Sequence, residues 1–178
     1  YCLYSGGLVI LLIIEIRGNV MTEYDENEKE IYVGGFKGDV KSGFVRSGRG
    51  KEMDGNGRVV YEGEWSDGKR NGSGTEVRDG NAVYTGEWKN GLRNGSGKEM
   101  RSNGTVVFTG IWVSGLRNGK GKEMDENGNG LYEGEWWNGK RNGVGEVLKG
   151  TRWVGHWKDG KMNGMEYEKD GNGVMKRG

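Results

Sequence analysis

The chain offers few side chains that could carry out catalysis, and those few have no obvious partners. Its single histidine is His156 and its single cysteine is Cys2. A zinc site needs several such ligands, and a Ser-His-Asp triad or a Cys-His pair needs a base beside its nucleophile. His156 also occupies a strand position that in related stretches of the chain holds glutamate. We therefore expect no catalytic residue, no metal site and no cofactor.

Acidic side chains recur at a spacing that could supply the carboxylate pairs of acid–base catalysis. The recurring positions are Glu62, Glu64, Glu87, Glu133 and Glu135. Because they repeat along the chain and alternate along strands, they favour a solvated strand face over a catalytic pair. The stretch Asp125–Gly130 begins like a calcium loop, but its twelfth position is Trp136 rather than glutamate. We interpret that stretch as a turn.

One basic column could bind a ligand. It consists of Arg70, Arg93, Arg117 and Arg141. Such a stripe could attract anionic lipid headgroups, at about 1 kcal/mol for each residue near an acidic membrane. Each arginine is also expected opposite a tryptophan, where its stem and guanidinium would cover the ring through a cation–π contact. We favour this structural role and keep the lipid-binding stripe as the alternative.

These side chains belong to a motif that repeats along the chain. The stretch Tyr61–Gly74, YEGEWSDGKRNGSG, returns with small changes from residues 84, 108, 132 and 153, and a weaker copy precedes it at residue 32. The starts lie 21 to 29 residues apart, which is the period of a repeat architecture. The repeat, rather than any single motif, therefore determines the predicted fold.

Within one repeat the aromatic and glycine positions alternate with a period of two. Tyr61, Gly63 and Trp65 therefore share one face of an extended strand. The repeat aromatics expected on this face are Tyr32, Phe36, Tyr61, Trp65, Tyr84, Trp88, Phe108, Trp112, Tyr132, Trp136, Trp153 and Trp157. The pairs of glycines across the hairpin leave bare backbone, against which an aromatic ring of a neighbouring repeat is expected to lie.

A two-residue turn follows each such strand. The turn pairs are Asp67–Gly68, Asn90–Gly91, Ser114–Gly115, Asn138–Gly139 and Asp159–Gly160, all suited to the positive φ angles of a type I′ turn. An uninterrupted ladder beyond the turn would place Trp65 opposite Arg70, Gly63 opposite Gly72 and Tyr61 opposite Gly74. The predicted unit is a β-hairpin.

The pattern resembles the MORN repeat, which has a tyrosine-x-glycine-x-tryptophan strand, an asparagine-glycine turn and a glycine-x-glycine return strand. The resemblance covers residues 32–166, with units starting at 32, 61, 84, 108, 132 and 153. It departs locally at Phe36, Ile111, His156 and Met162, and the first and last units are expected to act as caps. The fold that it implies is all-β, an elongated antiparallel meander of tandem hairpins that forms an open, solenoid-like strip.

The two ends of the chain lie outside this array. Residues 1–31 are expected to form a lead-in and residues 167–178 a tail or cap. The apolar run Leu8–Ile14 is too short to span a membrane. We prefer Met21 as the start of the natural protein, with a buried strand or a peripheral anchor as the alternative for the run. The acidic stretch Met21–Glu30 indicates a solvated segment.

Composition excludes several classes of function. Only 32% of the residues are hydrophobic, so a large globular core is not expected. The 27 basic and 26 acidic side chains nearly cancel, so the charge gives no reason to expect binding to nucleic acid. A single cysteine fits a reducing compartment. The resemblance implies a non-catalytic scaffold for a protein partner or a membrane-associated assembly, cytoplasmic, peripheral to a membrane or the cytoskeleton, and able to form a homodimer. The alternatives are binding of an anionic phospholipid, namely a phosphoinositide or phosphatidic acid, and a regulatory arm of a larger enzyme such as a phosphatidylinositol phosphate kinase or a SET methyltransferase.

Overall fold

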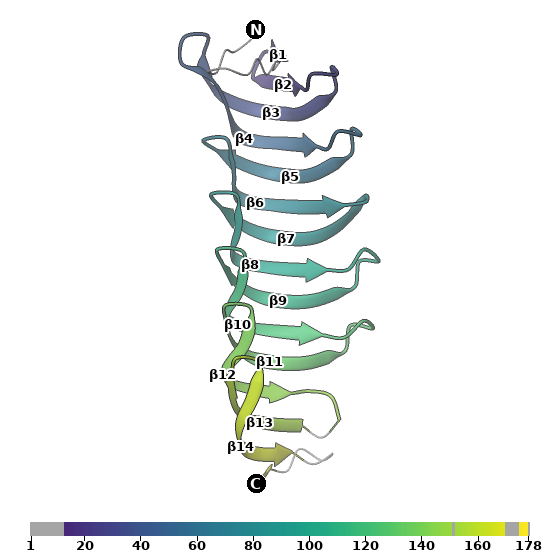
Figure 1. Cartoon of the computed structure of the whole chain (residues 1–178), viewed down its shortest axis with the longest axis vertical. Coiled ribbons are helices and arrows are strands. Elements are labelled where there is room, and N and C mark those ends of the chain that lie inside the picture. Colours follow the sequence, from purple (N-terminus) through teal and green to yellow (C-terminus); the bar gives the residue numbers. More distant parts are fainter. Residues whose placement is uncertain (1–12, 151, 170–174, 178) are drawn as a thin grey trace. The chain divides into compact units, whose positions relative to one another are not determined.

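The computed structural model describes residues 13–150, 152–169 and 175–177, and all regular structure within them is β-strand. The chain divides into two compact units, Tyr1–Gly91 and Leu92–Gly178. Inside each unit, consecutive strands pair antiparallel in chain order (Figure 1). The predicted all-β meander of tandem hairpins is confirmed. With no helix among them, the described residues hold none that could cross a membrane.

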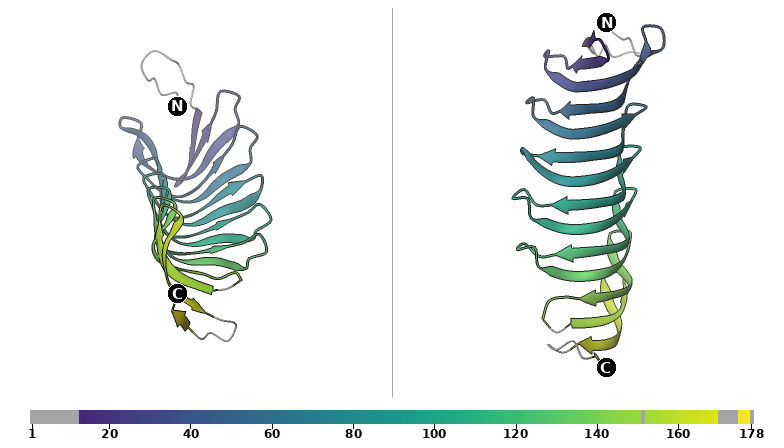
Figure 2. Two further views of the ribbon diagram at one scale, coloured as in Figure 1. Left: turned by 60° about the horizontal axis from the view of Figure 1, so that its bottom comes forward. Right: turned by 180° about the vertical axis from the view of Figure 1, so that it is seen from behind.

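The strands of the first unit are β1 (Ile13–Arg17), β2 (Val20–Tyr24), β3 (Glu30–Asp39), β4 (Gly43–Met53), β5 (Val59–Ser66), β6 (Lys69–Arg78) and β7 (Asn81–Lys89). Those of the second unit are β8 (Leu92–Met100), β9 (Val106–Val113), β10 (Leu116–Met124), β11 (Gly130–Trp137), β12 (Lys140–Val147), β13 (Arg152–Lys158), β14 (Lys161–Lys169) and β15 (Met175–Arg177). In each unit the turns that follow the tryptophan strands lie at one end of the strands, and the turns that precede them lie at the other (Figure 2).

The turns have the conformation that their dipeptides predict. In the first of them φ is +52° at Asp67 and +75° at Gly68, as a type I′ turn requires. Both residues also have positive φ in Asn90–Gly91, Ser114–Gly115, Asn138–Gly139 and Asp159–Gly160. Each turn glycine donates its N–H to the arginine carbonyl of the preceding hairpin, for example Gly139 to Arg117 at 2.9 Å. The turns therefore align successive hairpins within a unit.

The register differs from the uninterrupted ladder beyond the first pairs. Trp65 lies opposite Arg70 as predicted, but Gly63 pairs with Gly74 and Tyr61 pairs with Glu76. The predicted pairs of Gly63 with Gly72 and of Tyr61 with Gly74 are therefore wrong. Residues 71–73 all lie opposite the single residue 64, because the return strand bulges at Gly72, where φ is +86°.

The core of each unit is a set of aromatic rings on one face of the sheet. The predicted aromatics Tyr32, Tyr61, Trp65, Tyr84, Trp88, Phe108, Trp112, Tyr132, Trp136 and Trp157 are buried, whereas Phe36 and Trp153 are half-buried. The Tyr61 ring centroid lies 5.3 Å from that of Trp65 and 5.2 Å from that of Trp88, both edge to face. One tyrosine thus joins two hairpins, and edge-to-face pairs add stability beyond the area that they bury.

The glycine pairs provide the space for these rings. Tyr61 lies directly over Gly74, where a Cβ atom would collide with the ring. The ring directly over the Gly74 Cβ position therefore comes from the same hairpin. The neighbouring hairpin adds Trp88, whose indole N–H donates to the Gly74 carbonyl at 3.2 Å, so a ring of a neighbouring repeat also lies against this backbone as expected.

The sheet of the first unit begins upstream of Tyr32. Met21 in β2 is fully buried, and Glu23 is only 7% exposed. The interpretation of Met21–Glu30 as a solvated segment is therefore wrong for β2. Glu23 pairs with Tyr32, the pairing that a return strand makes with the next hairpin. Whether Met21 starts the natural protein stays a prediction.

The predictions for the two ends of the chain are tested only in part. Cys2 and most of the apolar run Leu8–Ile14 lie outside the described residues. Ile14 at the end of that run is buried in β1. At the other end, part of the expected tail belongs to strands, because β14 reaches Lys169 and β15 pairs with it.

Alkaline pH is expected to unfold the protein. Burial raises the pKa of Tyr32, Tyr61 and Tyr132 to about 12, above the ordinary value of 10.0. The unfolded chain loses these protons at lower pH than the folded chain does. The contribution of the three tyrosines to the free energy of unfolding is therefore fully present below pH 10 and is lost as pH rises from 10 towards 12. Tyrosinate absorbance and far-UV circular dichroism should therefore change together in that window. Full ionisation of these tyrosines near pH 10 in a folded protein would contradict the packing.

Candidate binding surfaces

A ladder of arginine and glutamate side chains covers the aromatic face of the first unit. The Arg46 guanidinium carbon lies 4.6 Å from the centroid of the Tyr32 ring and 5.0 Å from that of Trp65. Its Nη2 donates to Glu23 at 2.7 Å, and its Nη1 lies 3.6 Å from Glu52. Arg46 thus stacks on two hairpins and bridges two carboxylates.

Arg70 repeats this arrangement one hairpin further along. Its guanidinium lies 4.6 Å from the ring centroid of Tyr61 and 5.3 Å from that of Trp88. Its Nη2 donates to Glu52 at 2.6 Å. The Arg70 side chain is 23% exposed, so most of it lies against its partners.

The second unit carries its own ladder. Arg117 lies 4.4 Å from the centroid of Phe108 and 5.3 Å from that of Trp136. It donates to Glu99 at 2.6 Å, and its Nη1 lies 3.5 Å from Glu123. Arg141 and Arg93 belong to the same ladder.

Arg141 lies over Tyr132 and Trp157 and donates to Glu123 at 2.6 Å. Arg93 lies 5.2 Å from the Trp112 centroid, and its Nη1 is 3.5 Å from Glu99.

The contacts correct the expected partners of the arginine column. Arg117 pairs with Trp112 across the hairpin, but its guanidinium lies over Phe108 and over Trp136 of the next hairpin. The expectation that Arg117 covers Trp112 is therefore wrong. Met162 stands at the arginine position of the last hairpin, opposite Trp157.

Sequence reasoning missed part of this ladder. Arg46 falls outside the aligned arginine column of the sequence because the first hairpin has a longer loop, although it lies opposite Phe36 as Arg70 lies opposite Trp65. The glutamates were missed too, namely Glu23, Glu52, Glu99 and Glu123. The signal was present, because a Gly-Lys-Glu-Met phrase recurs at the last three of these positions.

The double change Arg93→Gln and Arg117→Gln is expected to lower the free energy of unfolding by about 2–4 kcal/mol. Each change removes a stacked guanidinium, and together they leave the partly buried Glu99 carboxylate without either of its cations. Urea unfolding measures the loss, and cosedimentation with acidic vesicles should change little. A double mutant of unchanged stability that has lost salt-sensitive vesicle binding would establish the lipid-binding stripe instead.

Two of the recurring carboxylates stabilise the bulge rather than extend freely into solvent. Glu64 lies over Gly72, and its Oε2 accepts the Ser73 N–H at 2.9 Å. Glu135 lies over Gly143 in the same way and accepts the Val144 N–H at 3.3 Å. A side chain at either glycine would meet the carboxylate. The structural role expected for these glutamates agrees with the contacts, although a purely solvated face does not describe them.

The remaining candidates for metal binding or catalysis, Asp125 and His156, lie in a turn and on a strand. The Asp125 carboxylate accepts the N–H groups of Asn127 at 3.0 Å and of Asn129 at 2.8 Å. The hydrogen bond from the Asn129 backbone holds the pKa of Asp125 below its ordinary value. His156 is exposed and lies opposite Val144. Among the described residues no group of three or more histidine, cysteine, aspartate or glutamate side chains could hold a metal.

The face opposite the rings carries a groove in the first unit. Its volume is about 640 Å³, and its floor includes the backbone of Gly50, Gly63, Gly74 and Gly86. Side chains of Lys51, Glu62 and Thr85 lie along its walls. The Lys51 ammonium is 3.4 Å from a Glu62 carboxylate oxygen, so the wall carries both charges and is not a basic site.

The second unit has an equivalent groove of about 810 Å³. Its floor includes Gly121, Gly134 and Gly145, and its walls include Thr109 and Tyr167. Lys122 and Glu133 lie 3.4 Å apart there, at the same hairpin positions as the ion pair of the first groove. The grooves therefore follow from the repeat itself.

The family models agree with this architecture. The MORN repeat family matches residues 61–82, 84–106, 108–130, 132–147 and 153–165, which together make up more than half of the chain. The chain belongs to the MORN-repeat family. A search of the curated proteins found no match.

Proposed function

We propose that this chain is a non-catalytic interaction module whose grooved face binds an extended segment of a partner protein. The observation that carries the proposal is a difference between the two faces of the sheet. The rings, arginines and glutamates of one face are engaged with one another. The opposite face offers a groove in each unit, with a glycine floor and half-exposed polar walls.

The chemistry of the grooves favours a polypeptide over an anionic lipid. Lys51 and Lys122 each have a carboxylate partner in the wall. Arg49 in the first groove and Lys120 in the second are balanced by Glu87 and by Glu135 and Glu146 of the same linings, so neither groove carries a net positive charge. The Thr75 and Thr85 hydroxyls, 3.2 Å apart, add groups that can donate or accept hydrogen bonds. Mixed charges and hydroxyls over bare backbone suit the alternating polar groups of a peptide. A scaffold role in the cytoplasm, peripheral to a membrane or the cytoskeleton, belongs to the same proposal.

Filling the first groove tests this function. The change Thr75→Arg and Thr85→Arg adds bulk to the groove without touching the aromatic face. Proteins that the wild-type chain enriches from cells, measured by quantitative mass spectrometry, should be lost by this variant. They should be kept by the control Asn127→Arg, which changes an exposed turn. An unchanged protein set, or binding only to vesicles that contain acidic lipid, would refute the proposal.

A further inference from the structure

One part of the second unit carries exposed apolar side chains at positions that are polar in other hairpins. The five side chains Leu92, Ile111, Val113, Leu116 and Trp137 are 49%, 38%, 46%, 47% and 59% exposed. We call them the apolar patch. Other hairpins of the chain place polar residues at these positions, such as Glu64, Ser66, Lys69 and Lys89. The patch is therefore not a requirement of the fold.

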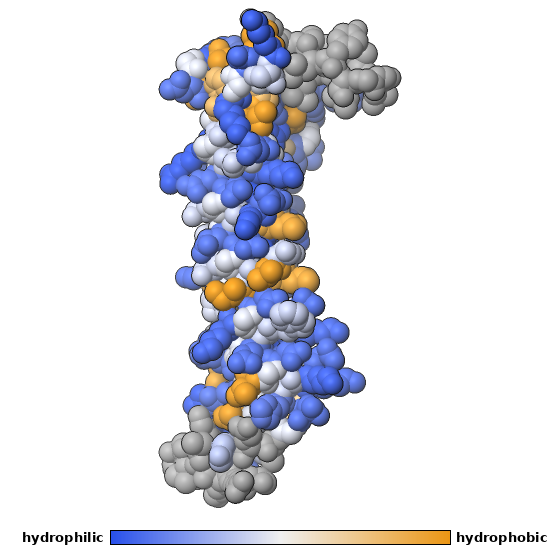
Figure 3. All heavy atoms as spheres, turned by 90° about the vertical axis from the view of Figure 1, so that its left-hand side faces the viewer, coloured by the Kyte–Doolittle hydropathy of each residue, from blue (hydrophilic) through white to orange (hydrophobic). Residues whose placement is uncertain are grey.

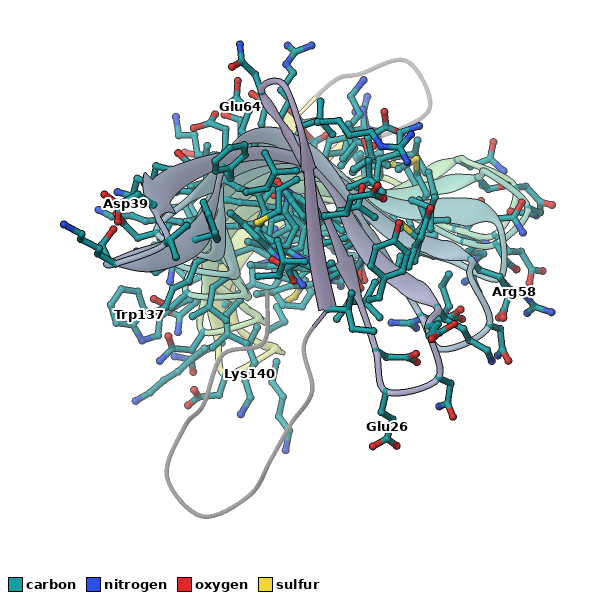
Figure 4. All side chains as sticks on the ribbon, turned by 90° about the horizontal axis from the view of Figure 1, so that it is seen from above. Glu26, Asp39, Arg58, Glu64, Trp137 and Lys140 are labelled. Atoms are coloured by element: carbon teal, nitrogen blue, oxygen red, sulfur yellow. The ribbon has the colours of Figure 1, made fainter. Side chains whose placement is uncertain are left out.

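The five side chains lie on the grooved face, on the consecutive strands β8 to β11 and close to the two-residue turns. Val113 and Leu116 are paired across their hairpin. Leu92 reaches towards the turn glycine Gly115, and Leu116 towards Gly139, two residues after Trp137. Figure 3 looks onto this side of the molecule, where apolar side chains interrupt a polar surface. Figure 4 shows Trp137 projecting away from the sheet.

The patch continues into the groove of the second unit. A hollow of about 340 Å³ lies beside Trp137 and is lined by Asn118, Lys120, Glu135 and Asn142. Lys120 and Glu135 also line the larger groove. A chain that occupies the groove can therefore extend past Lys120 and reach the exposed indole.

The surroundings of the patch are basic. Lys140 lies directly opposite Trp137, and both Lys140 and Lys120 are exposed. The nearby carboxylate of Glu135 is already an acceptor for the Val144 N–H. A ligand that covers the indole therefore gains from carboxylates beside its apolar group.

The size of the patch favours a short ligand. Its exposed apolar area is on the order of 400 Å², within the range of functional patches on monomers. A stable dimer needs about 800 Å² on each partner, which the patch alone does not supply. A large apolar anchor on an indole is, however, the kind of contact that dominates small interfaces.

We propose that the apolar patch selects the partner: it binds a peptide segment that carries one large apolar side chain flanked by acidic residues, next to the stretch held in the second groove. The inference rests on the proposed function, since it assigns a sequence preference to the same face. The second unit is then the selective half of the chain, because the first unit has Ser66 and Lys69 where the second has Val113 and Leu116.

The test uses the whole chain and a phage-displayed library of random dodecapeptides. The patch variant is Val113→Ser, Leu116→Lys and Trp137→Lys, which installs residues that other hairpins already carry. The matched control is Lys158→Ser, a change before the turn of the last hairpin. Peptides selected by the wild-type chain should share a large apolar residue between acidic ones. The patch variant should bind them at least about tenfold more weakly, and the control should bind them equally.

Each other outcome overturns a defined part of the account. Selected peptides that bind the patch variant as tightly as the wild type would overturn the inference and leave the proposed function standing. A wild-type chain that selects no peptide would contradict both. A wild-type dimer that becomes monomeric in the patch variant would assign the patch to a second copy. Patch-dependent binding to phosphatidylcholine vesicles would assign it to a membrane.

Discussion

Trp112→Ala is expected to lower the free energy of unfolding by about 3–5 kcal/mol, as truncation of a buried aromatic does. Trp112 is only 3% exposed. Its ring packs edge to face on Phe108, with centroids 5.5 Å apart, and the Arg93 guanidinium lies over it at 5.2 Å. Removing the indole therefore removes the support of one ring and one cation at once. Urea unfolding followed by far-UV circular dichroism measures the loss.

Trp137→Ala is the matched control, because it removes the same side chain from the opposite face. Trp137 is 59% exposed, and substitutions at such sites change stability by about 0.5 kcal/mol or less. Similar losses for the two variants would mean that the assignment of the two faces is wrong.

Gly74→Ala is expected to cost about 2–3 kcal/mol, although it adds a single methyl group. The Cβ atom would collide with the ring of Tyr61, and overpacking of a tight core has a cost of this size. If the ring moves away, it loses the hydrogen bond from its hydroxyl to the Glu64 carbonyl, 3.1 Å long, and its contact with Arg70. The shift in the urea midpoint measures the effect.

Gly55→Ala provides the comparison for this prediction. Gly55 lies in an exposed turn with no atom within 4 Å of its Cβ position and without a positive φ, so alanine should fit there without loss. Equal stability of both alanine variants would contradict the packing of Tyr61 on the glycine pair.

Much of the fold could be predicted from the sequence because its signals are local. The turn dipeptides require positive φ, and the aromatic-x-Gly-x-aromatic spacing defines one strand face; both expectations are met at Asp67 and Trp65. The register beyond Arg70 could not be obtained in this way. It depends on a bulge at Gly72, whose conformation is stabilised by Glu64 from the facing strand.

Contacts between hairpins were the other part that local patterns could not supply. A stripe of arginines in the sequence does not reveal that Arg70 reaches Tyr61, Trp88 and Glu52 together, because these partners come from three different strands. The grooves also arise only when glycines of successive hairpins lie side by side. The apolar patch has a signal in the sequence, because Leu116 stands at the hairpin position that Lys69 occupies in an earlier repeat. That replacement indicates a surface patch only once the face of the sheet that the residue occupies is known.

Site-specific photo-crosslinking tests most directly the claim that one face holds the fold and the other binds a partner. Benzoylphenylalanine replaces either Thr109, in the wall of the second groove, or Arg101, beside Glu99, Arg117 and Glu123 on the aromatic side. The account predicts crosslinks to a partner polypeptide from position 109 and few from position 101. Crosslinks mainly from position 101, or from neither position to any protein, would contradict it.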